Sequence, residues 1–178
     1  MIVVVGIAGA GKSVQSEMLA RKLKCEWVGA GRLLRAKMGE REQQKMLSGE
    51  LLDDDITIGV LEEAFAHIDA AHREFVLDGC PRTLRQAEWL HGKLERRELT
   101  LTTIIHLLAS ETAAERRLLS RGRPDDYEAA ISERFREYEQ TIKPIITYFR
   151  ERGLTVHDID GEQTVEEVHG AIMAVLGH

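Results

Sequence analysis

The sequence is poor in cysteine and has no excess of basic residues. Its 178 residues include two cysteines, Cys25 and Cys80, which are too few for a disulfide framework or a zinc site. We therefore expect both thiols to be reduced and half-buried, as in cytosolic proteins. The formal net charge of −6 argues against a nucleic-acid partner, because general nucleic-acid binding needs a basic surface.

Long apolar runs, internal repeats and low-complexity segments are also missing. The apolar start ends at residue 5, whereas a membrane-spanning helix needs about 20 apolar residues and the core of a signal peptide about 7 to 15. We therefore expect a cytoplasmic protein with no membrane partner, and we expect a monomer. Hydrophobic residues make up 43% of the chain, which is enough for the core of one α/β domain.

A phosphate-binding pattern follows the apolar start. Residues 6–13 have the spacing G-x-x-x-x-G-K-S and lie between a β-branched segment and a helical pattern. The glycines turn backbone N–H groups toward an anion, and the following helix directs its positive end to the same point. Lys12 adds a mobile charge, and the Ser13 hydroxyl can bind Mg²⁺. A plain glycine-rich turn is the alternative, but the flanking strand and helix favour a nucleoside triphosphate site.

Strand-like and helical segments alternate along the chain. The expected strands are Ile2–Val5, Cys25–Val28, Phe75–Leu77, Thr103–Leu108 and Leu154–Ile159. This alternation predicts a three-layer α/β fold, in which a five-stranded parallel sheet has helices on both faces. Ligands of such sheets bind at the carboxyl ends of the strands. The apolar residues from Ile131 to Phe149 predict one long helix that bends near Pro144.

Two segments interrupt the alternation. Residues 29–56 separate the second strand from a strong helical pattern, and residues 121–126 interrupt an arginine-rich helical stretch. We interpret both as coverings of the phosphate site within a single domain, the first as a flap and the second as a short lid. The core then comprises residues 1–28, 57–120 and 127–178.

Charged residues near the expected strand ends suit phosphate chemistry. Asp78 follows the third strand, where a carboxylate can hold water on Mg²⁺, although a turn cap is the alternative. Pro81 is a candidate cis proline that would fix Arg82 at the mouth of the site, and arginine binds phosphate through two parallel hydrogen bonds. Six arginines lie between residues 116 and 136. In an acidic chain they indicate a small anionic ligand, with a solvated helix face as the alternative for each.

The motifs contain no convincing catalytic base. The sequence has no serine–histidine–acid pattern and no cluster of metal ligands. A sugar or protein hydroxyl that accepts a phosphoryl group needs a base, whereas a phosphate monoester is already largely ionised at pH 7 because its second pKa is about 6. The sequence therefore favours transfer to a phosphate, which needs positioning, Mg²⁺ and several arginines.

Further motifs along the chain resemble those of one family. They are Gly29-Ala-Gly31-Arg-Leu-Leu-Arg35, Leu47-Ser-Gly-Glu-Leu-Leu-Asp-Asp54, Asp78-Gly-Cys-Pro-Arg82-Thr-Leu-Arg-Gln86, Arg117-Leu-Leu-Ser-Arg121, Gly122-Arg123-Pro-Asp-Asp126, Glu133-Arg134-Phe and Asp160-Gly161-Glu-Gln163. With the P-loop they cover nearly the whole chain, which resembles the adenylate kinase family of nucleoside monophosphate kinases. The resemblance implies a P-loop kinase fold and a phosphotransferase that uses Mg²⁺ and converts ATP and AMP into two ADP.

The resemblance also implies roles for individual residues. The ATP-binding residues would be Gly9, Ala10, Gly11, Lys12, Ser13, Val14, Arg117, Arg121, Gly161 and Gln163. The AMP-binding residues would be Ala30, Gly31, Arg35, Glu50, Leu51, Leu52, Gly79, Arg82 and Gln86, with the flap as the acceptor-binding segment. The catalytic residues would be Lys12, Arg82, Arg121, Arg123 and Arg134. Ser13 would bind the metal directly and Asp78 through water.

Gln86 illustrates how one motif supports two roles. Its amide offers an acceptor and two donors, which matches the donor–acceptor edge of adenine. The same residue completes a capping box with Thr83, so a helix cap is the alternative.

Departures from the family pattern leave alternatives for the function. Arg32 replaces the usual aspartate, Ala30 a threonine or serine, and Cys80 an aromatic residue, while Gly122 is the only residue between two lid arginines. Such a lid is too short to bind zinc or form a hairpin. Alanine at position 30 also occurs in pyrimidine-directed relatives, so a UMP/CMP-type kinase is one alternative. A nucleotide-binding regulatory protein with little turnover is the alternative from another class.

Overall fold

A five-stranded parallel sheet forms the centre of the computed structural model, which describes residues 1–177. The strands are β1 (Ile2–Gly6), β2 (Glu26–Gly29), β3 (Phe75–Asp78), β4 (Thr103–Leu108) and β5 (Val156–Asp160). They lie in the order β2-β3-β1-β4-β5, and every neighbouring pair is parallel. The predicted α/β fold with five parallel strands is confirmed, although β2 and β5 begin and end later than expected.

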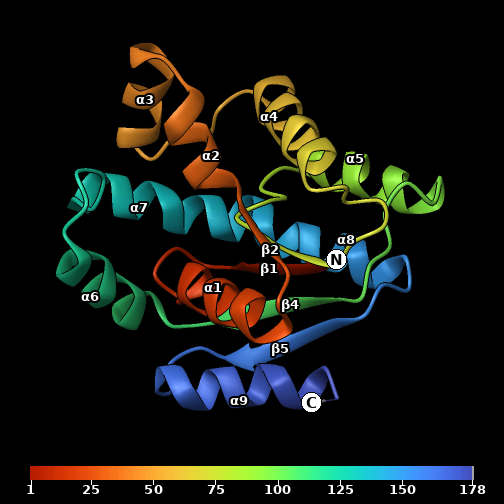
Figure 1. Cartoon of the computed structure of the whole chain (residues 1–178). Helices are drawn as coiled ribbons and strands as arrows, with labels where there is room; N and C mark the ends of the chain where they lie inside the picture. Colours follow the sequence, from red (N-terminus) through yellow and green to blue (C-terminus); the bar gives the residue numbers. More distant parts are fainter. Residues whose placement is uncertain (178) are drawn as a thin grey trace.

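Helices cover both faces of this sheet. They are α1 (Lys12–Leu23), α2 (Ala30–Lys37), α3 (Glu40–Leu47), α4 (Asp54–His67), α5 (Leu84–Glu95), α6 (Glu111–Arg121), α7 (Glu128–Glu137), α8 (Lys143–Glu151) and α9 (Val165–Val175), with a π-helical turn η1 (Tyr138–Ile142) between α7 and α8. Figure 1 shows α1 and α9 on one side of the sheet and α5, α7 and α8 on the other. None of these helices is long and apolar enough to cross a membrane.

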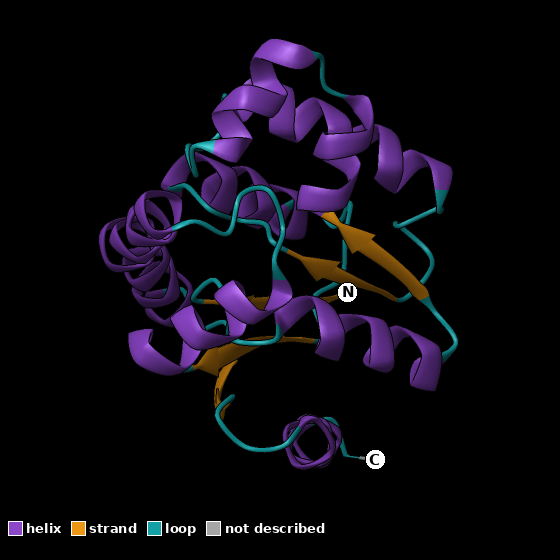
Figure 2. Cartoon of the chain, turned by 90° about the vertical axis from the view of Figure 1, so that its left-hand side faces the viewer, coloured by secondary structure: helices purple, strands orange, loops and turns teal. Residues whose placement is uncertain are grey.

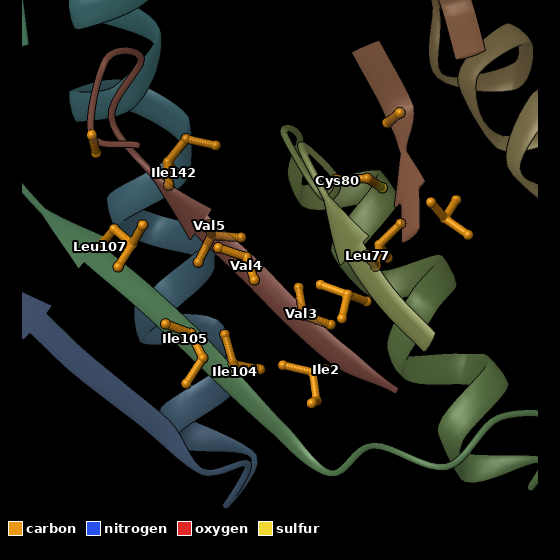
Figure 3. Close-up of a cluster of buried hydrophobic side chains, with 14 of the residues drawn as sticks. Ile2, Val3, Val4, Val5, Leu77, Cys80, Ile104, Ile105, Leu107 and Ile142 are labelled. Carbon is orange, nitrogen blue, oxygen red and sulfur yellow. The ribbon is translucent and has the colours of Figure 1, made fainter. Parts of the chain in front are cut away.

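The central strands are apolar because both of their faces are buried. All of β1 is buried, and Val3 and Val4 are fully inaccessible to solvent. A continuous β-branched run is typical of a parallel strand between two helical layers. Side chains of β1 and β4 belong to one buried apolar cluster with Ile142 from the π-helical turn and Cys80 after β3 (Figure 3). Cys25 is half-buried as predicted, but the prediction for Cys80 was wrong, because Cys80 is fully buried in this core.

The expected long helix between Ile131 and Phe149 is not one regular helix. It consists of α7, η1 and α8, and Pro144 lies in the first turn of α8. Proline is tolerated there because the first helical N–H groups have no intrahelical partner. The irregularity therefore comes before the proline, at Tyr138 to Ile142, and π-helical turns are frequent at functional sites.

The two predicted coverings lie at the end of the molecule to which the strands point. Residues 29–56 form the end of β2, then α2 and α3, and the first residues of α4, while Arg121 ends α6 and the lid connection spans residues 122–127. Figure 2, which looks toward the carboxyl ends of the strands, shows the helices of the flap above them. This arrangement places both segments over the P-loop between β1 and α1.

Candidate functional site

The P-loop wraps closely around the start of α1. Gly9 has φ of +87°, and a Cβ on this residue would lie 2.5 Å from the carbonyl oxygen of Ala114 in α6. Glycine is therefore required for both the left-handed backbone and the close approach. Lys12 Nζ donates to the carbonyl oxygens of Gly6 and Ile7 at 2.8 Å each. Burial, assisted by the nearby charge of Arg82, lowers the pKa of Lys12 to about 8.

Ser13 and Asp78 meet at the start of this helix. The Ser13 hydroxyl donates to Asp78 Oδ2 at 2.6 Å. Val4 of β1 pairs with Asp78 in the parallel register, which is why two residues far apart in the sequence reach the same sheet edge. Asp78 itself is buried. The pair offers hydroxyl and carboxylate oxygens, which are the ligands that Mg²⁺ prefers.

The predicted acceptor arginines line the same cavity as the P-loop. Arg82 Nε donates to the carbonyl oxygen of Gly79 at 3.2 Å, and its Nη1 lies 3.8 Å from the carboxylate of Glu137. Arg35 projects from α2 into the same space. Burial and the nearby positive charge of Arg123 lower the pKa of Arg35, so the flap and the lid each bring a cation to one place.

The lid arginines are held by two adjacent aspartates. Asp126, with a side chain that is 0% exposed, accepts from Arg121 Nε at 2.8 Å and Nη2 at 2.6 Å, from Arg134 Nη1 at 3.3 Å and from the backbone N–H of Arg123 at 3.0 Å. Arg134 also pairs with Asp125. This network aligns the arginines that precede and follow the lid connection.

Arg117 ties α6 to the loop that follows β5. Its guanidinium donates to the carbonyl oxygens of Gly161 at 2.6 Å and Glu162 at 3.2 Å. Gln163 Nε2 donates to Asp160 Oδ2 at 3.3 Å, closing the same loop. The structure thereby brings together three of the residues predicted to bind ATP: Arg117, Gly161 and Gln163.

One cavity of about 610 Å³, which we call the central cavity, is lined by the P-loop, by Asp78 and by the arginines described above. Every predicted site residue lines it except Ala30, which is buried behind the wall. The lining also includes Trp27, Arg32 and Thr57, which are not among the residues assigned above to ATP or AMP. A cavity of this size is large enough for a substrate and is lined by convergent polar groups, as binding sites are.

The sequence model of the adenylate kinase family matches residues 4–154 of this chain. The chain belongs to the adenylate kinase family. It is 34% identical to the adenylate kinase of Corynebacterium urealyticum over 181 residues, covering 98% of both chains. It is 32% identical to that of Mycolicibacterium paratuberculosis and 34% identical to that of Corynebacterium glutamicum strain R, covering 99% of this chain and 98% of each relative. The predicted family and the predicted phosphotransferase class are confirmed.

The wall of the central cavity carries an arginine beside an aromatic ring. Arg32 lies 4.8 Å above the ring centre of Trp27 and donates to its carbonyl oxygen at 3.2 Å. A cation over an aromatic face is held by the ring quadrupole. Arg32 is therefore fixed at the wall of the central cavity.

Sequence reasoning missed the acidic partners of the cavity arginines. Asp125 and Asp126 come directly after Pro124 in the lid connection, and this Asp-Asp pair was the available signal. Glu137 could not be recognised from the sequence, because it lies in a helical stretch rich in charge and meets Arg82 only through the fold.

The hydrogen-bond network of His106 also depends on the fold. His106 contacts Asp158 at 2.8 Å and the Tyr138 hydroxyl at 2.9 Å, which joins β4, β5 and η1.

Proposed function

We propose that this protein catalyses the Mg²⁺-dependent transfer of the γ-phosphoryl group of ATP to AMP, giving two ADP. The observation that carries the proposal is the central cavity, whose lining holds the P-loop together with Arg35, Arg82 and Gln86. One nucleotide bound by the P-loop and another bound by Arg35 and Arg82 would bring their phosphate groups together among these cations.

The donor nucleotide would use the P-loop end. Backbone N–H groups at the start of α1 and the ammonium group of Lys12 would bind its phosphates. Arg117 and the Gly161–Gln163 loop would hold its base. Ser13 and Asp78 fit a magnesium ion, the first as a direct ligand and the second through water. When bound, Mg²⁺ supplies charge neutralisation between the donor phosphates.

The acceptor would lie between the flap and α5, without a catalytic base. Arg35 and Arg82 would bind its phosphate, which is already largely ionised at pH 7 because its second pKa is about 6. Arg121, Arg123 and Arg134 would stabilise the charge on the phosphoryl group as it moves. Closure of the flap and lid would exclude water, which would otherwise accept the phosphoryl group in place of AMP.

An acceptor panel tests this function. ADP formation from Mg·ATP would be measured with AMP, dAMP, GMP, CMP and UMP, and without acceptor. We expect AMP to give the highest kcat/KM, at least about tenfold above the non-adenine acceptors, because one unmatched polar contact costs roughly 1–3 kcal/mol. Equal use of UMP or CMP would establish the pyrimidine alternative. Nucleotide binding without ADP formation from any acceptor would establish the regulatory alternative.

A further inference from the structure

Arg32 is a cation of the central cavity whose partner is an aromatic residue. It belongs to α2, lines the cavity and is exposed. Its guanidinium lies 4.8 Å from the ring centre of Trp27 and donates to the Trp27 carbonyl oxygen. Across residues 1–177 no carboxylate lies within ion-pairing distance of this guanidinium, whereas Arg82, Arg121 and Arg134 each lie beside one. The charge of Arg32 is therefore free to meet an anion in the cavity.

The strand register places Arg32 on the face of the sheet that carries Asp78. Gly29 of β2 pairs with Asp78 of β3, and paired strands lie about 4.8 Å apart. Side chains two residues apart along a strand share a face, as do the side chains of register partners, so Trp27 belongs to this face. Its ring lies over Gly29, because a Cβ on Gly29 would be 3.4 Å from three ring atoms. Arg32 over that ring is thus on the side of the sheet where Asp78 meets Ser13.

Trp27 holds Arg32 through the face of its ring. The ring is half-buried and packs against the apolar core. Among the residues that the structure describes, its indole N–H has no hydrogen-bond partner, so packing alone holds the ring. A guanidinium is attracted to such a face, and the bond to the Trp27 carbonyl oxygen sets its orientation. Arg32 is therefore ordered before a ligand arrives, which lowers the entropy lost on binding.

A cation near Asp78 changes the charge balance that a bound triphosphate meets. The Asp78 carboxylate would lie beside the phosphates held by the P-loop, and like charges repel. In Mg·ATP the positive charge of the metal offsets this repulsion, whereas metal-free ATP brings no such charge. A guanidinium binds phosphate oxygens through two parallel hydrogen bonds. Arg32 can therefore supply to metal-free ATP part of the positive charge that Mg·ATP already carries.

We infer that Arg32, held over the Trp27 ring, is a phosphate-binding residue that narrows the difference in affinity between metal-free ATP and Mg·ATP. The inference rests on the donor site of the proposed function and goes beyond it, because it concerns the nucleotide without its metal. Trp27 is a positioning residue, because its effect on the nucleotide passes through Arg32.

Calorimetry tests the role of Arg32 without any turnover. The Kd of the wild type and of Arg32→Ala would be measured at pH 7 and fixed ionic strength, for ATP in EDTA and for ATP with excess Mg²⁺. We expect Arg32→Ala to weaken metal-free ATP by about fivefold or more and Mg·ATP by about twofold or less, because a hydrogen bond to a charged group is lost where no metal charge compensates. Arg41→Ala, which alters an exposed arginine of α3 outside the cavity, should leave both values unchanged.

The possible results separate this inference from the proposed function. Equal weakening of the two forms of ATP in Arg32→Ala, or no weakening of either, would overturn the inference. Weaker binding of AMP with unchanged binding of both forms of ATP would also overturn it, because Arg32 would then serve the acceptor. If the wild type binds neither form of ATP, the donor site of the proposed function fails instead.

Two substitutions at Trp27 test the positioning. Trp27→Phe keeps an aromatic face and should keep the ratio of the two Kd values, whereas Trp27→Leu removes the face and should raise the ratio of metal-free to Mg·ATP Kd by about twofold or more. Both ligands are measured on the same variant, so a general loss of stability does not change the ratio. Trp27→Leu combined with Arg32→Ala should raise the ratio no further than Arg32→Ala alone. A wild-type ratio in Trp27→Leu, or a further rise in the double variant, would overturn the role of Trp27.

Discussion

At the scale of single residues, the fold changes the pKa of the Lys12 ammonium group. It donates to two backbone carbonyl groups, and burial together with Arg82 lowers its pKa to about 8. Phosphate groups beside a lysine favour the charged form and raise its pKa. Nucleotide binding should therefore be linked to proton uptake by Lys12 wherever the free protein has lost that proton.

This linkage gives a pH-dependent prediction for nucleotide binding. Below pH 8 Lys12 is already protonated and affinity for ATP should be level. As the pH rises through 8, affinity should fall by up to about tenfold per pH unit, because the proton must be regained. Calorimetry at pH 8.5 in two buffers of different ionisation enthalpy should show uptake of more than half a proton, and at pH 7 almost none.

Lys12→Ala is the matching variant. It should abolish phosphoryl transfer and remove the proton uptake of any remaining binding, while circular dichroism stays that of the wild type, because the lost side chain contributes charge rather than apolar packing. Activity above about a tenth of wild type with an intact fold would contradict the role of Lys12, since loss of one pre-organised charge contact at such a site costs more than this.

Site residues that belong to a short sequence motif could be predicted from the sequence. Site residues that matter because of side chains distant in the sequence could not. Lys12 and Ser13 were predicted because the P-loop spacing leaves little choice of geometry, and the structure places them where expected. Asp126 and Glu137 were missed because their importance comes from arginines that the fold brings near them. The roles assigned to the site residues remain predictions that the experiments above test.

At the scale of elements, strands and helices with regular periodicity were predictable and the junctions between them were not. β1 and β4 were predicted to within one residue because they are buried on both faces. The π-helical turn was missed, because periodicity alone does not show that Tyr138 must reach His106 across the core. A helix irregularity that accompanies one tertiary hydrogen bond cannot be recognised from the local sequence pattern.

The contact between the flap and α7 is another tertiary feature, and Gly49 makes it possible. Gly49 follows α3 with φ of +86°, and a Cβ on it would lie 2.8 Å from the carbonyl oxygen of Ala130 in α7. Gly49→Ala should hold the flap away from α7 and reduce kcat/KM for AMP by about tenfold, since a left-handed alanine and a steric overlap together cost of order 1–3 kcal/mol.

Gly39→Ala is the control for this substitution within the same flap. Gly39 has a negative φ, and the nearest atom to an added Cβ is the end of the Glu42 side chain at 3.5 Å, an ordinary contact. Steady-state kinetics with AMP varied should separate the two variants. If Gly49→Ala is no more impaired than Gly39→Ala, the flap does not need this contact for catalysis.

The charge of the whole molecule is distributed unevenly, and this matters for the ligand that it binds best. The chain is acidic overall, yet Lys12 of the P-loop and seven arginines line the central cavity. The arginines come from the flap, the loop after β3, α6, the lid and α7, and they are Arg32, Arg35, Arg82, Arg117, Arg121, Arg123 and Arg134. Such a cleft focuses its field on anions and accelerates their binding. A ligand that spans the cavity would meet cations from both of its ends.

Two adenosines joined by five phosphates should therefore bind far more tightly than AMP. Once one adenosine is bound, the second site is filled as an intramolecular step, which raises affinity by about 10²–10⁴-fold when the linker fits. Calorimetry at fixed ionic strength should show this gain for the wild type, and Arg35→Ala should remove much of it by weakening the acceptor end. Arg41→Ala, which alters an exposed residue of α3 outside the cavity, should keep it. Affinity no higher than that of ATP alone would mean that the P-loop end and the acceptor end do not act as one site.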